Sequence, residues 1–164
     1  MKDNKPKSKN KPAAALLAAM LAIGTPFVAT QEGLSVVPYR DIGGVWTWCY
    51  GETEGVVPKK TFTNSECSAL LRVKLLAYGM SVWWLIDTKM TAPRWAALTS
   101  FSYNVGINAF SNSTLRRKIN ANDPKACDEL NRWTYIGKRD CKIPTNGCMG
   151  LPNRRNEERK LCNS

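Results

Sequence analysis

Three residues near the start of the chain have side chains and a spacing that could support acid-catalysed hydrolysis. Glu32 is followed after eight residues by Asp41, and Thr47 follows Asp41 after five more. Enzymes that cut glycosidic bonds use a pair of acids: one protonates the leaving oxygen and the other handles water or the sugar carbon. Carboxylate pairs are common, however, and the spacing alone favours a solvated surface pair. Thr47 on its own is typical of a strand, because threonine favours sheets.

The sequence contains no histidine, which removes several other catalytic chemistries. A Ser-His-Asp triad, a Cys-His hydrolase and a His-ligated zinc hydrolase are all excluded within this chain. An enzyme of this composition must rely on carboxylates, hydroxyls, thiols, lysine or arginine. We therefore expect neither a cofactor nor a metal ion.

Six cysteines indicate an exported protein with disulfides more than a cytosolic one. A zinc ribbon is less favoured, because the sequence has no Cys-x-x-Cys pair. The count permits many pairings, and the sequence does not choose among them. Only six residues separate Cys141 from Cys148, so this pair can close a short loop and we expect it to form a disulfide. Cys127 and Cys162 are a second candidate pair, if the helices that carry them are neighbours.

The formal net charge of +11 suits an anionic partner such as nucleic acid, anionic lipid or a bacterial envelope. No arginine-rich run or aromatic-basic repeat marks a nucleic-acid module, so we expect no nucleic-acid partner. The basic residues are scattered, which is equally consistent with a solvated surface that aids solubility.

The first 31 residues divide into a basic start and an uncharged segment. Residues 1–11 hold five lysines and one aspartate, and residues 12–31 carry no charge. As a helix the uncharged segment would be about 30 Å long, which matches the hydrocarbon thickness of a bilayer. It is rich in alanine and contains Gly24 and Pro26, so insertion should be marginal and reversible. A cleaved signal peptide, a releasable anchor, and a permanent anchor or buried helix all stay open. The releasable anchor is favoured, because Phe27 stands where a cleavage site needs a small residue.

The elements that must position the acids follow from local signals. Residues 36–50 predict a hairpin around Asp41-Ile42-Gly43-Gly44. A capping box at residues 63–66 predicts a helix to about Ile86, and further helices are expected over 91–103, 115–120, 123–133 and 152–162, with a loop over 137–150. One small antiparallel sheet followed by a mainly helical lobe is an α+β pattern. We divide the chain into a basic N-terminus (1–11), a weak signal anchor (12–31) and a catalytic domain (32–164).

The stretch EGLSVVPYRDIGGVWT, residues 32–47, resembles the active-site signature of the phage lysozyme family, glycoside hydrolase family 24. That signature begins with a Glu that is followed directly by Gly. Eight residues separate the Glu from an Asp or Cys, and five more separate that residue from a Thr. The segments RWAALTSFSYNVGINAFSNSTLRRKIN (94–120) and GLPNRRNEERKLC (150–162) resemble the central and closing helices of the family. The resemblance therefore spans about residues 32–162.

The resemblance implies a lysozyme that hydrolyses the β-1,4 bonds between N-acetylmuramic acid and N-acetylglucosamine in peptidoglycan, causing host cell lysis. Glu32 would be the general acid, and Asp41 and Thr47 would position the water. The resemblance also implies an active-site cleft between the small sheet and the helical lobe. Asn104 borders that cleft in relatives and would bind substrate. Arg154 would contact substrate or an acidic neighbour, although a helix-end salt bridge explains it as well.

Two features depart from the family pattern or extend it. Many relatives carry histidine where Tyr50 and Glu52 stand, and shorter members lack the loop between Cys141 and Cys148. Residues 12–31 resemble the signal-anchor-release segment of some phage endolysins. This implies a monomer tethered to the inner membrane through residues 12–31, facing the periplasm, and later released into it. The subtype that activates through a cysteine in the anchor does not fit, because the first cysteine is Cys49.

Two alternative functions remain at this stage. A lytic transglycosylase can work with a single glutamate, but Asp41 and Thr47 give water a place and so favour hydrolysis. A membrane-tethered wall-binding protein without catalysis is the alternative from a different class, and the intact triad of residues disfavours it.

Overall fold

The structure, a computed structural model, describes residues 10–41, 44–55 and 59–164. Residues 1–9, which make up most of the predicted basic N-terminus, lie outside these ranges, as do residues 42–43 of the predicted hairpin turn. Helices dominate the described chain, accompanied by two small antiparallel sheets of two strands each. The predicted α+β class, with a small hairpin followed by a mainly helical lobe, is confirmed.

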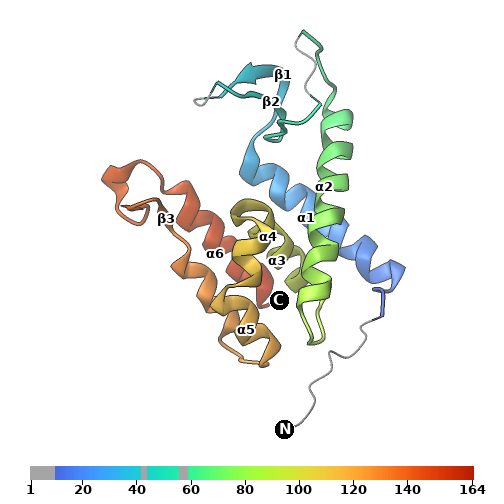
Figure 1. The fold of residues 1–164 in the computed structure, drawn as a ribbon, viewed down its shortest axis with the longest axis vertical. Helices are drawn as coiled ribbons and strands as arrows, with labels where there is room; N and C mark the ends of the chain where they lie inside the picture. Colours follow the sequence, from blue (N-terminus) through green and yellow to red (C-terminus); the bar gives the residue numbers. More distant parts are fainter. Residues whose placement is uncertain (1–9, 42–43, 56–58) are drawn as a thin grey trace.

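The described residues form six α-helices, two 3-10 helices and four short strands. In chain order they are α1 (Ala14–Glu32), β1 (Ser35–Arg40), β2 (Trp46–Cys49), α2 (Asn64–Leu85), α3 (Ala92–Val105), α4 (Ile107–Ser111), α5 (Thr114–Asn120), the 3-10 helix η1 (Ala126–Arg132), β3 (Tyr135–Ile136), β4 (Arg139–Asp140), the 3-10 helix η2 (Pro144–Asn146) and α6 (Gly150–Cys162). The hairpin β1–β2 lies at one end of α1 and α2, and the other helices gather below it (Figure 1).

The helix boundaries follow the local signals in the sequence. The Thr63 hydroxyl accepts a hydrogen bond from the Glu66 backbone N–H, and the Glu66 carboxylate accepts one from the Thr63 backbone N–H, so the predicted capping box begins α2. At α3 the Thr91 hydroxyl accepts a hydrogen bond from the Arg94 backbone N–H, and the helix ends before Gly106, whose φ of 89° favours glycine.

Two sequence predictions in the C-terminal third need correction. The helix expected over 123–133 is a 3-10 helix over Ala126–Arg132. The loop expected over 137–150 contains β4 and η2, and β4 pairs with β3 around the turn at Gly137. Strands of two residues are too short to give an alternating pattern, so the sequence does not reveal them.

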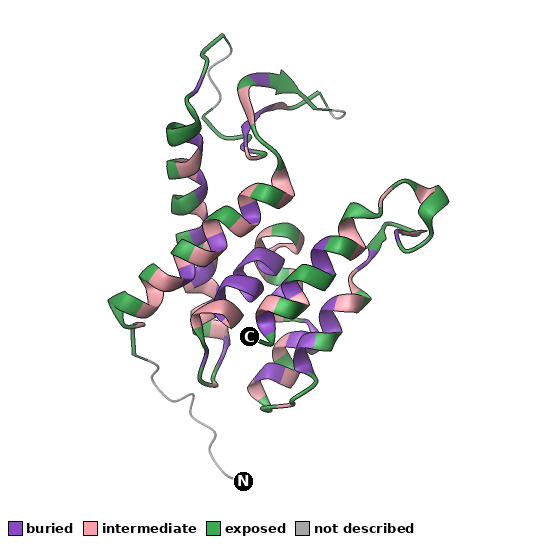
Figure 2. Cartoon of the chain, turned by 180° about the vertical axis from the view of Figure 1, so that it is seen from behind, coloured by how far each residue is buried: buried purple, intermediate pink, exposed green. Residues whose placement is uncertain are grey.

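The core is built around α3. Every residue from Trp95 to Ser102 is buried, and α1, α2 and α6 all pack against this helix. In Figure 2 the middle of the helical lobe is accordingly buried, while the hairpin and the surrounding helices have exposed faces. The largest apolar side chains that are fully buried belong to this lobe: Trp95, Phe101, Phe110, Met20, Leu75, Ile86, Leu98, Leu115 and Leu130.

The first helix packs on this core along a narrow stripe. Only Met20, Gly24 and Val28 of α1 are buried, and they recur every four residues on one face. Pro26 lies within the helix and cannot donate a helical hydrogen bond. Among the described residues, α1 is the one helix that is long and apolar enough to cross a membrane by length and composition.

Candidate active site

Glu32 is the last residue of α1, at the point where the chain leaves the helix for the hairpin. Gly33 follows with a φ of 71°, a left-handed conformation that favours glycine, and β1 begins at Ser35. The Glu32 side chain is 22% exposed. The predicted acid is therefore held at a helix end and can still be reached from solvent.

Two open pockets meet at Glu32, each with a volume of about 270 Å³. The first faces α2 and α3 and is lined, besides Glu32, by Tyr50, Gly51, Lys74, Tyr78, Tyr103 and Asn104. The second faces the hairpin and is lined, besides Glu32, by Gly33, Leu34, Ser35, Tyr39, Cys49 and Gly51. A carboxyl group shared by two adjoining hollows is well placed to act on a chain-like substrate that lies across both.

Arg154 of α6 holds Glu32 in place. Its Nη1 atom lies 2.6 Å from Glu32 Oε1, and the arginine is 5% exposed. Its other nitrogen atoms donate to Glu158 and to Ser100. The acidic neighbour considered for Arg154 in the sequence is thus Glu32 itself, and the pair fixes the direction of the Glu32 carboxylate.

Asn104 stands at the exposed rim next to Glu32. It lines the first pocket of Glu32 and also a further pocket of about 490 Å³ that reaches Trp133 and the β3 residue Tyr135. Its Oδ1 atom accepts a hydrogen bond from Arg155 Nη2 at 2.8 Å. Because that bond orients the amide, Asn104 presents a fixed polar group between the first Glu32 pocket and the pocket that reaches Trp133.

Tyr103 forms the inner wall of the first pocket. Its hydroxyl donates to the Tyr50 carbonyl at 3.3 Å, and its ring packs edge-on against Tyr78 at 5.4 Å. Burial, with the negative charge of Glu32 nearby, raises the pKa of Tyr103 to about 12. The phenol is therefore a neutral donor that joins α3 to the end of the hairpin.

The hairpin residues Asp41 and Thr47 have local partners in this structure. The Asp41 carboxylate accepts a hydrogen bond from the Val45 N–H at 2.9 Å, and the Thr47 hydroxyl donates to the Val45 carbonyl at 3.2 Å. Asp41 is exposed, whereas Thr47 is 5% exposed. Neither lines the two pockets described above, although Thr47 pairs with the pocket residue Tyr39 in the β1–β2 ladder. Their catalytic roles stay predictions.

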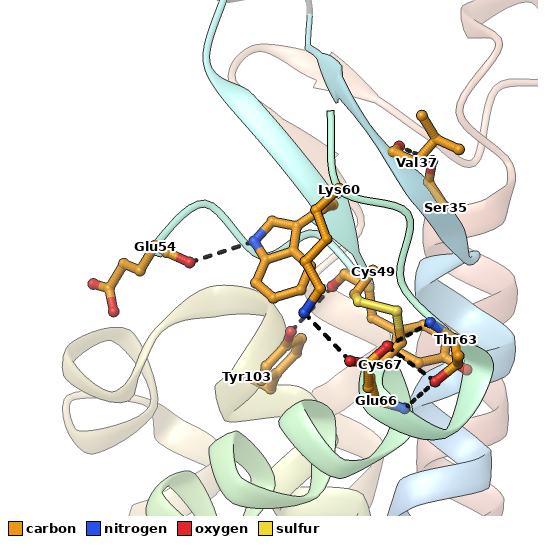
Figure 3. Close-up of a disulfide and its surroundings, with 11 residues drawn as sticks. Ser35, Val37, Cys49, Glu54, Lys60, Thr63, Glu66, Cys67 and Tyr103 are labelled. Carbon is orange, nitrogen blue, oxygen red and sulfur yellow. Dashed lines mark hydrogen bonds and ion pairs between the residues drawn. A yellow bond between two sulfur atoms is a disulfide. The ribbon is translucent and has the colours of Figure 1, made fainter. Parts of the chain in front are cut away.

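The hairpin is tied to α2 by covalent and ionic links. A disulfide joins Cys49 to Cys67, and Glu52 accepts a hydrogen bond from Lys74 at 2.7 Å (Figure 3 shows the disulfide). Burial raises the pKa of Glu52, but the bonds from Lys74 and from the backbone N–H groups of Glu54 and Thr53 outweigh it, so the net pKa lies below the ordinary value. Glu52 is therefore held in an ion pair with Lys74, which links the end of the hairpin to α2.

The other cysteines pair within the C-terminal part of the chain. Disulfides join Cys141 to Cys148 and Cys127 to Cys162, the two pairings expected from the sequence. The first closes the segment that follows β4, and the second fastens α6 to η1. No group of three or more acidic and cysteine side chains in the described ranges is placed to hold a metal ion.

Several residues at the site were not singled out from the sequence. Lys74, Tyr78 and Tyr103 line the pocket, and Glu158 lies behind Arg154. The tyrosines look like ordinary helix residues in the sequence. Glu158 did carry a signal, because it lies four residues after Arg154 and so shares its helix face.

Comparison with known proteins places this arrangement in a family. The sequence model described as phage lysozyme matches residues 29–158. The SAR-endolysin of Enterobacteria phage PA-2 is 41% identical, over 89% of this chain and 86% of its own, and that of Bacteriophage PS119 is 39% identical, over 96% and 95%. A crystal structure of a P22 lysozyme variant superposes with a TM-score of 0.76 at 28% identity, covering 87% of this chain and 97% of its own. The chain therefore belongs to the phage lysozyme family.

Proposed function

We propose that Glu32 is the general acid of this enzyme and that Asp41 and Thr47 position the attacking water. The coarser function follows from the family and the SAR-endolysin relatives: the chain is an endolysin, a lysozyme-type glycosidase that hydrolyses peptidoglycan. The bonds that we assign to it are the β-1,4 links between N-acetylmuramic acid and N-acetylglucosamine.

The observation that carries the proposal is the place of Glu32. Its carboxyl group lies at a helix end, shared by two adjoining pockets, and is held by a nearly buried arginine. A general acid must reach the leaving oxygen with a fixed geometry, and proton transfer of this kind typically contributes 10²–10⁴-fold to the rate, as an order of magnitude. The Arg154 Nη1 atom, 2.6 Å from Glu32 Oε1, holds the carboxyl group in one direction at the junction of the two pockets.

The hairpin would supply the second half of the chemistry. The Asp41 carboxylate attracts water or the positive charge that develops on the sugar, and the Thr47 hydroxyl orients the water. Water attacking from the opposite face inverts the anomeric carbon, which requires carboxyl groups roughly 6.5–9.5 Å apart. Asn104, at the rim of the first pocket, binds the sugar chain, and Arg154 acts mainly on Glu32.

Mutation of Glu32 with analysis of the products tests this proposal. Glu32→Gln should lower the rate of wall digestion by at least about 100-fold with the fold intact, whereas the exposed control Glu54→Gln should digest like the wild type. Circular dichroism checks the fold. A Glu32→Gln variant that keeps more than about a tenth of the activity contradicts the role of the acid.

Product masses separate the remaining alternatives. A hydrolase adds water and leaves reducing ends, whereas a lytic transglycosylase leaves anhydro ends. Anhydro products would show that the enzyme is a lytic transglycosylase. Full activity in Asp41→Ala would also favour that reaction over hydrolysis. Asp41→Cys should keep activity, because the family signature allows cysteine there. A folded protein that binds walls without reducing their turbidity would point to the wall-binding alternative.

We also propose that residues 12–31 first hold the enzyme in the inner membrane, with residues 1–11 in the cytoplasm and Glu32 facing the periplasm. Five lysines oppose translocation of the N-terminus, and disulfides form on the periplasmic side. The same segment forms most of α1 in the folded enzyme, and Met20 and Val28 are fully buried there. Release into the periplasm therefore completes the fold that holds Glu32, which makes the membrane form inactive.

A further inference from the structure

A buried cluster of charged side chains lies behind Glu32, at the contact between α6 and α3. Glu158 is fully buried, and its Oε1 atom accepts hydrogen bonds from Arg154 Nε at 3.2 Å and from the Ser100 hydroxyl at 2.7 Å. Arg155 contacts both carboxylate oxygens of Glu158. Its Nη2 atom donates to Oε1 at 3.4 Å, and its Nε atom lies 3.2 Å from Oε2 as an ion pair. Through Arg154 the cluster reaches the carboxylate of Glu32.

The cluster contains two arginines but only one fully buried carboxylate. Burial lowers the pKa of Arg155 to about 10, which leaves its guanidinium charged near neutral pH. Burial raises the pKa of Glu158, and the two guanidinium groups and the Ser100 hydroxyl offset that rise only in part. With Glu158 ionised, one of the two positive charges is balanced inside the cluster, and one remains to pair with Glu32.

Titratable groups from three helices and from the hairpin face Glu32, and the hairpin side contributes Tyr39 and Tyr50. Tyr78 of α2 lines the first pocket beside them. Arg154 of α6 donates to it, and Tyr103 of α3 lies close enough for the Glu32 charge to raise the tyrosine pKa. Lys74 of α2 lines the same pocket but pairs with Glu52 at 2.7 Å. The charge on Lys74 is therefore largely balanced, and Arg154 is the cation in hydrogen-bond contact with Glu32.

We propose that Glu158 is a positioning residue for the reaction: it fixes the Arg154 guanidinium against Glu32 and balances the charge of Arg155. This inference rests on the proposed role of Glu32 as general acid. Without the negative charge of Glu158, two guanidinium groups would act on the single carboxylate of Glu32 and keep it ionised down to lower pH. An acid that loses its proton too early cannot protonate the leaving oxygen.

The direct test follows the Glu32 carboxyl signal by NMR in the full-length soluble protein labelled at the glutamate carboxyl carbons. The Glu32 signal is identified by its loss in Glu32→Gln. Glu158→Gln keeps the shape of the side chain and an oxygen for Arg154, but removes the charge. We expect the midpoint of the Glu32 titration to fall by about one pH unit. The control is Glu157→Gln, an exposed carboxylate one residue earlier on α6, which should leave the midpoint unchanged.

Activity gives a second reading of the same shift. Wall digestion by Glu158→Gln should decline on the alkaline side at lower pH than in the wild type, by the same amount as the NMR midpoint. The decline should appear in kcat more than in KM, because Glu158 is buried and does not contact substrate. A structural role alone would lower the melting temperature and the rate at all pH values without moving the midpoint.

A change of opposite sign guards against a variant that fails to fold. Arg155→Met removes a positive charge, and its side chain can pack on Phe101, where the guanidinium now lies 5.0 Å from the ring centre. The Glu32 midpoint should then rise. In the double variant Glu158→Gln/Arg155→Met the charge is balanced again, so the midpoint should return towards the wild-type value.

The outcomes separate this inference from the proposed function. If no variant moves the Glu32 midpoint, or if Glu158→Gln and Arg155→Met move it in the same direction, the role of Glu158 is wrong. If the midpoint moves as expected but Glu32→Gln still digests walls, the coupling of Glu158 to Glu32 stands and the proposed acid is wrong.

Discussion

The helices α1 and α3 are both apolar and lie side by side, yet they are buried in different ways. Every residue of α3 from Trp95 to Ser102 is inside the protein, whereas α1 buries only Met20, Gly24 and Val28. The remaining apolar residues of α1 are at least partly exposed, and Leu17, Leu21 and Phe27 are half-buried. α3 is therefore the centre of the fold, and α1 is docked onto it along one stripe.

The docking stripe depends on small residues opposite α1. A methyl group placed on Gly79 of α2 would meet Met20 Cε at 2.5 Å, and one placed on Gly24 would meet Ala96 Cβ at 3.6 Å. Gly79 thus leaves the space that Met20 fills. α1 therefore has a defined packing site on the protein and still carries enough apolar surface to lie in a bilayer. α3 differs, because its apolar residues are buried in the core.

Removal of the docked helix α1 should have the largest effect on the protein. A protein lacking residues 1–29 would lose the buried side chains of Met20 and Val28, and most of the helix that ends at Glu32. Losses of about 2–5 kcal/mol for a large buried side chain would exhaust much of a typical folding free energy. We expect neither a cooperative thermal transition nor wall digestion. A control lacking residues 2–9 should retain both, and a stable, active protein without residues 1–29 would show that α1 is dispensable.

A single substitution tests the packing of α1 against α2. Met20→Ala should lower the free energy of unfolding of the soluble form by about 2–5 kcal/mol, because Met20 is fully buried against Gly79. Val73→Ala, at a position that is 67% exposed on α2, serves as the control and should change it little. Denaturant unfolding measures both. If Met20→Ala were as stable as the wild type, packing of the stripe would not hold α1 on the protein.

The affinity of α1 for the membrane can be raised at positions that do not pack in the fold. Ala18 and Ala22 are exposed on α1, so Ala18→Leu/Ala22→Leu adds apolar surface without a clash. Two leucines should favour insertion by on the order of 1 kcal/mol and raise the membrane-bound fraction several-fold. The melting temperature of the soluble form should stay the same, unlike in Met20→Ala. An unchanged partition between membrane and soluble fractions would argue against the anchor.

The smallest effect is expected at Gly24. Alanine there makes ordinary contact with Ala96 and removes the conformational cost of glycine in a helix. Gly24→Ala should therefore stabilise the soluble form by about 0.5–1 kcal/mol. Gly24→Leu has no such space against Ala96 and should destabilise it. Thermal melting of both variants is the measurement, and a destabilising alanine would mean that the α1–α3 contact is tighter than described.

Local signals explain why much of the fold was predictable. The capping box at Thr63, the cap at Thr91 and the stop at Gly106 are contained in a few neighbouring residues, and α2 and α3 begin and end there. The spacing of Glu32, Asp41 and Thr47 is equally local. Such signals do not depend on what the segment packs against, so they survive without knowledge of the tertiary structure.

Features that depend on packing could not be predicted in this way. Residues 12–31 have the composition of a weak anchor, and nothing local shows that Met20 fits above Gly79. A charged residue such as Glu158 is usually exposed, and its burial becomes clear only when α6 lies against α3. The walls of the Glu32 pockets likewise come from helices far apart in the sequence.

The claim that one helix serves as membrane anchor and then as the support of Glu32 is tested most directly by fractionation. The full chain, carrying an N-terminal tag, is expressed in cells and followed before and after an uncoupler is added. Lysines held on the cytoplasmic side by the membrane potential cost about 2.3 kcal/mol each per 100 mV to move across. Collapse of the potential should therefore convert inactive, membrane-bound protein into soluble, tagged, wall-digesting enzyme. Soluble enzyme that has lost the tag would instead mean an ordinary cleaved signal peptide and would contradict the account.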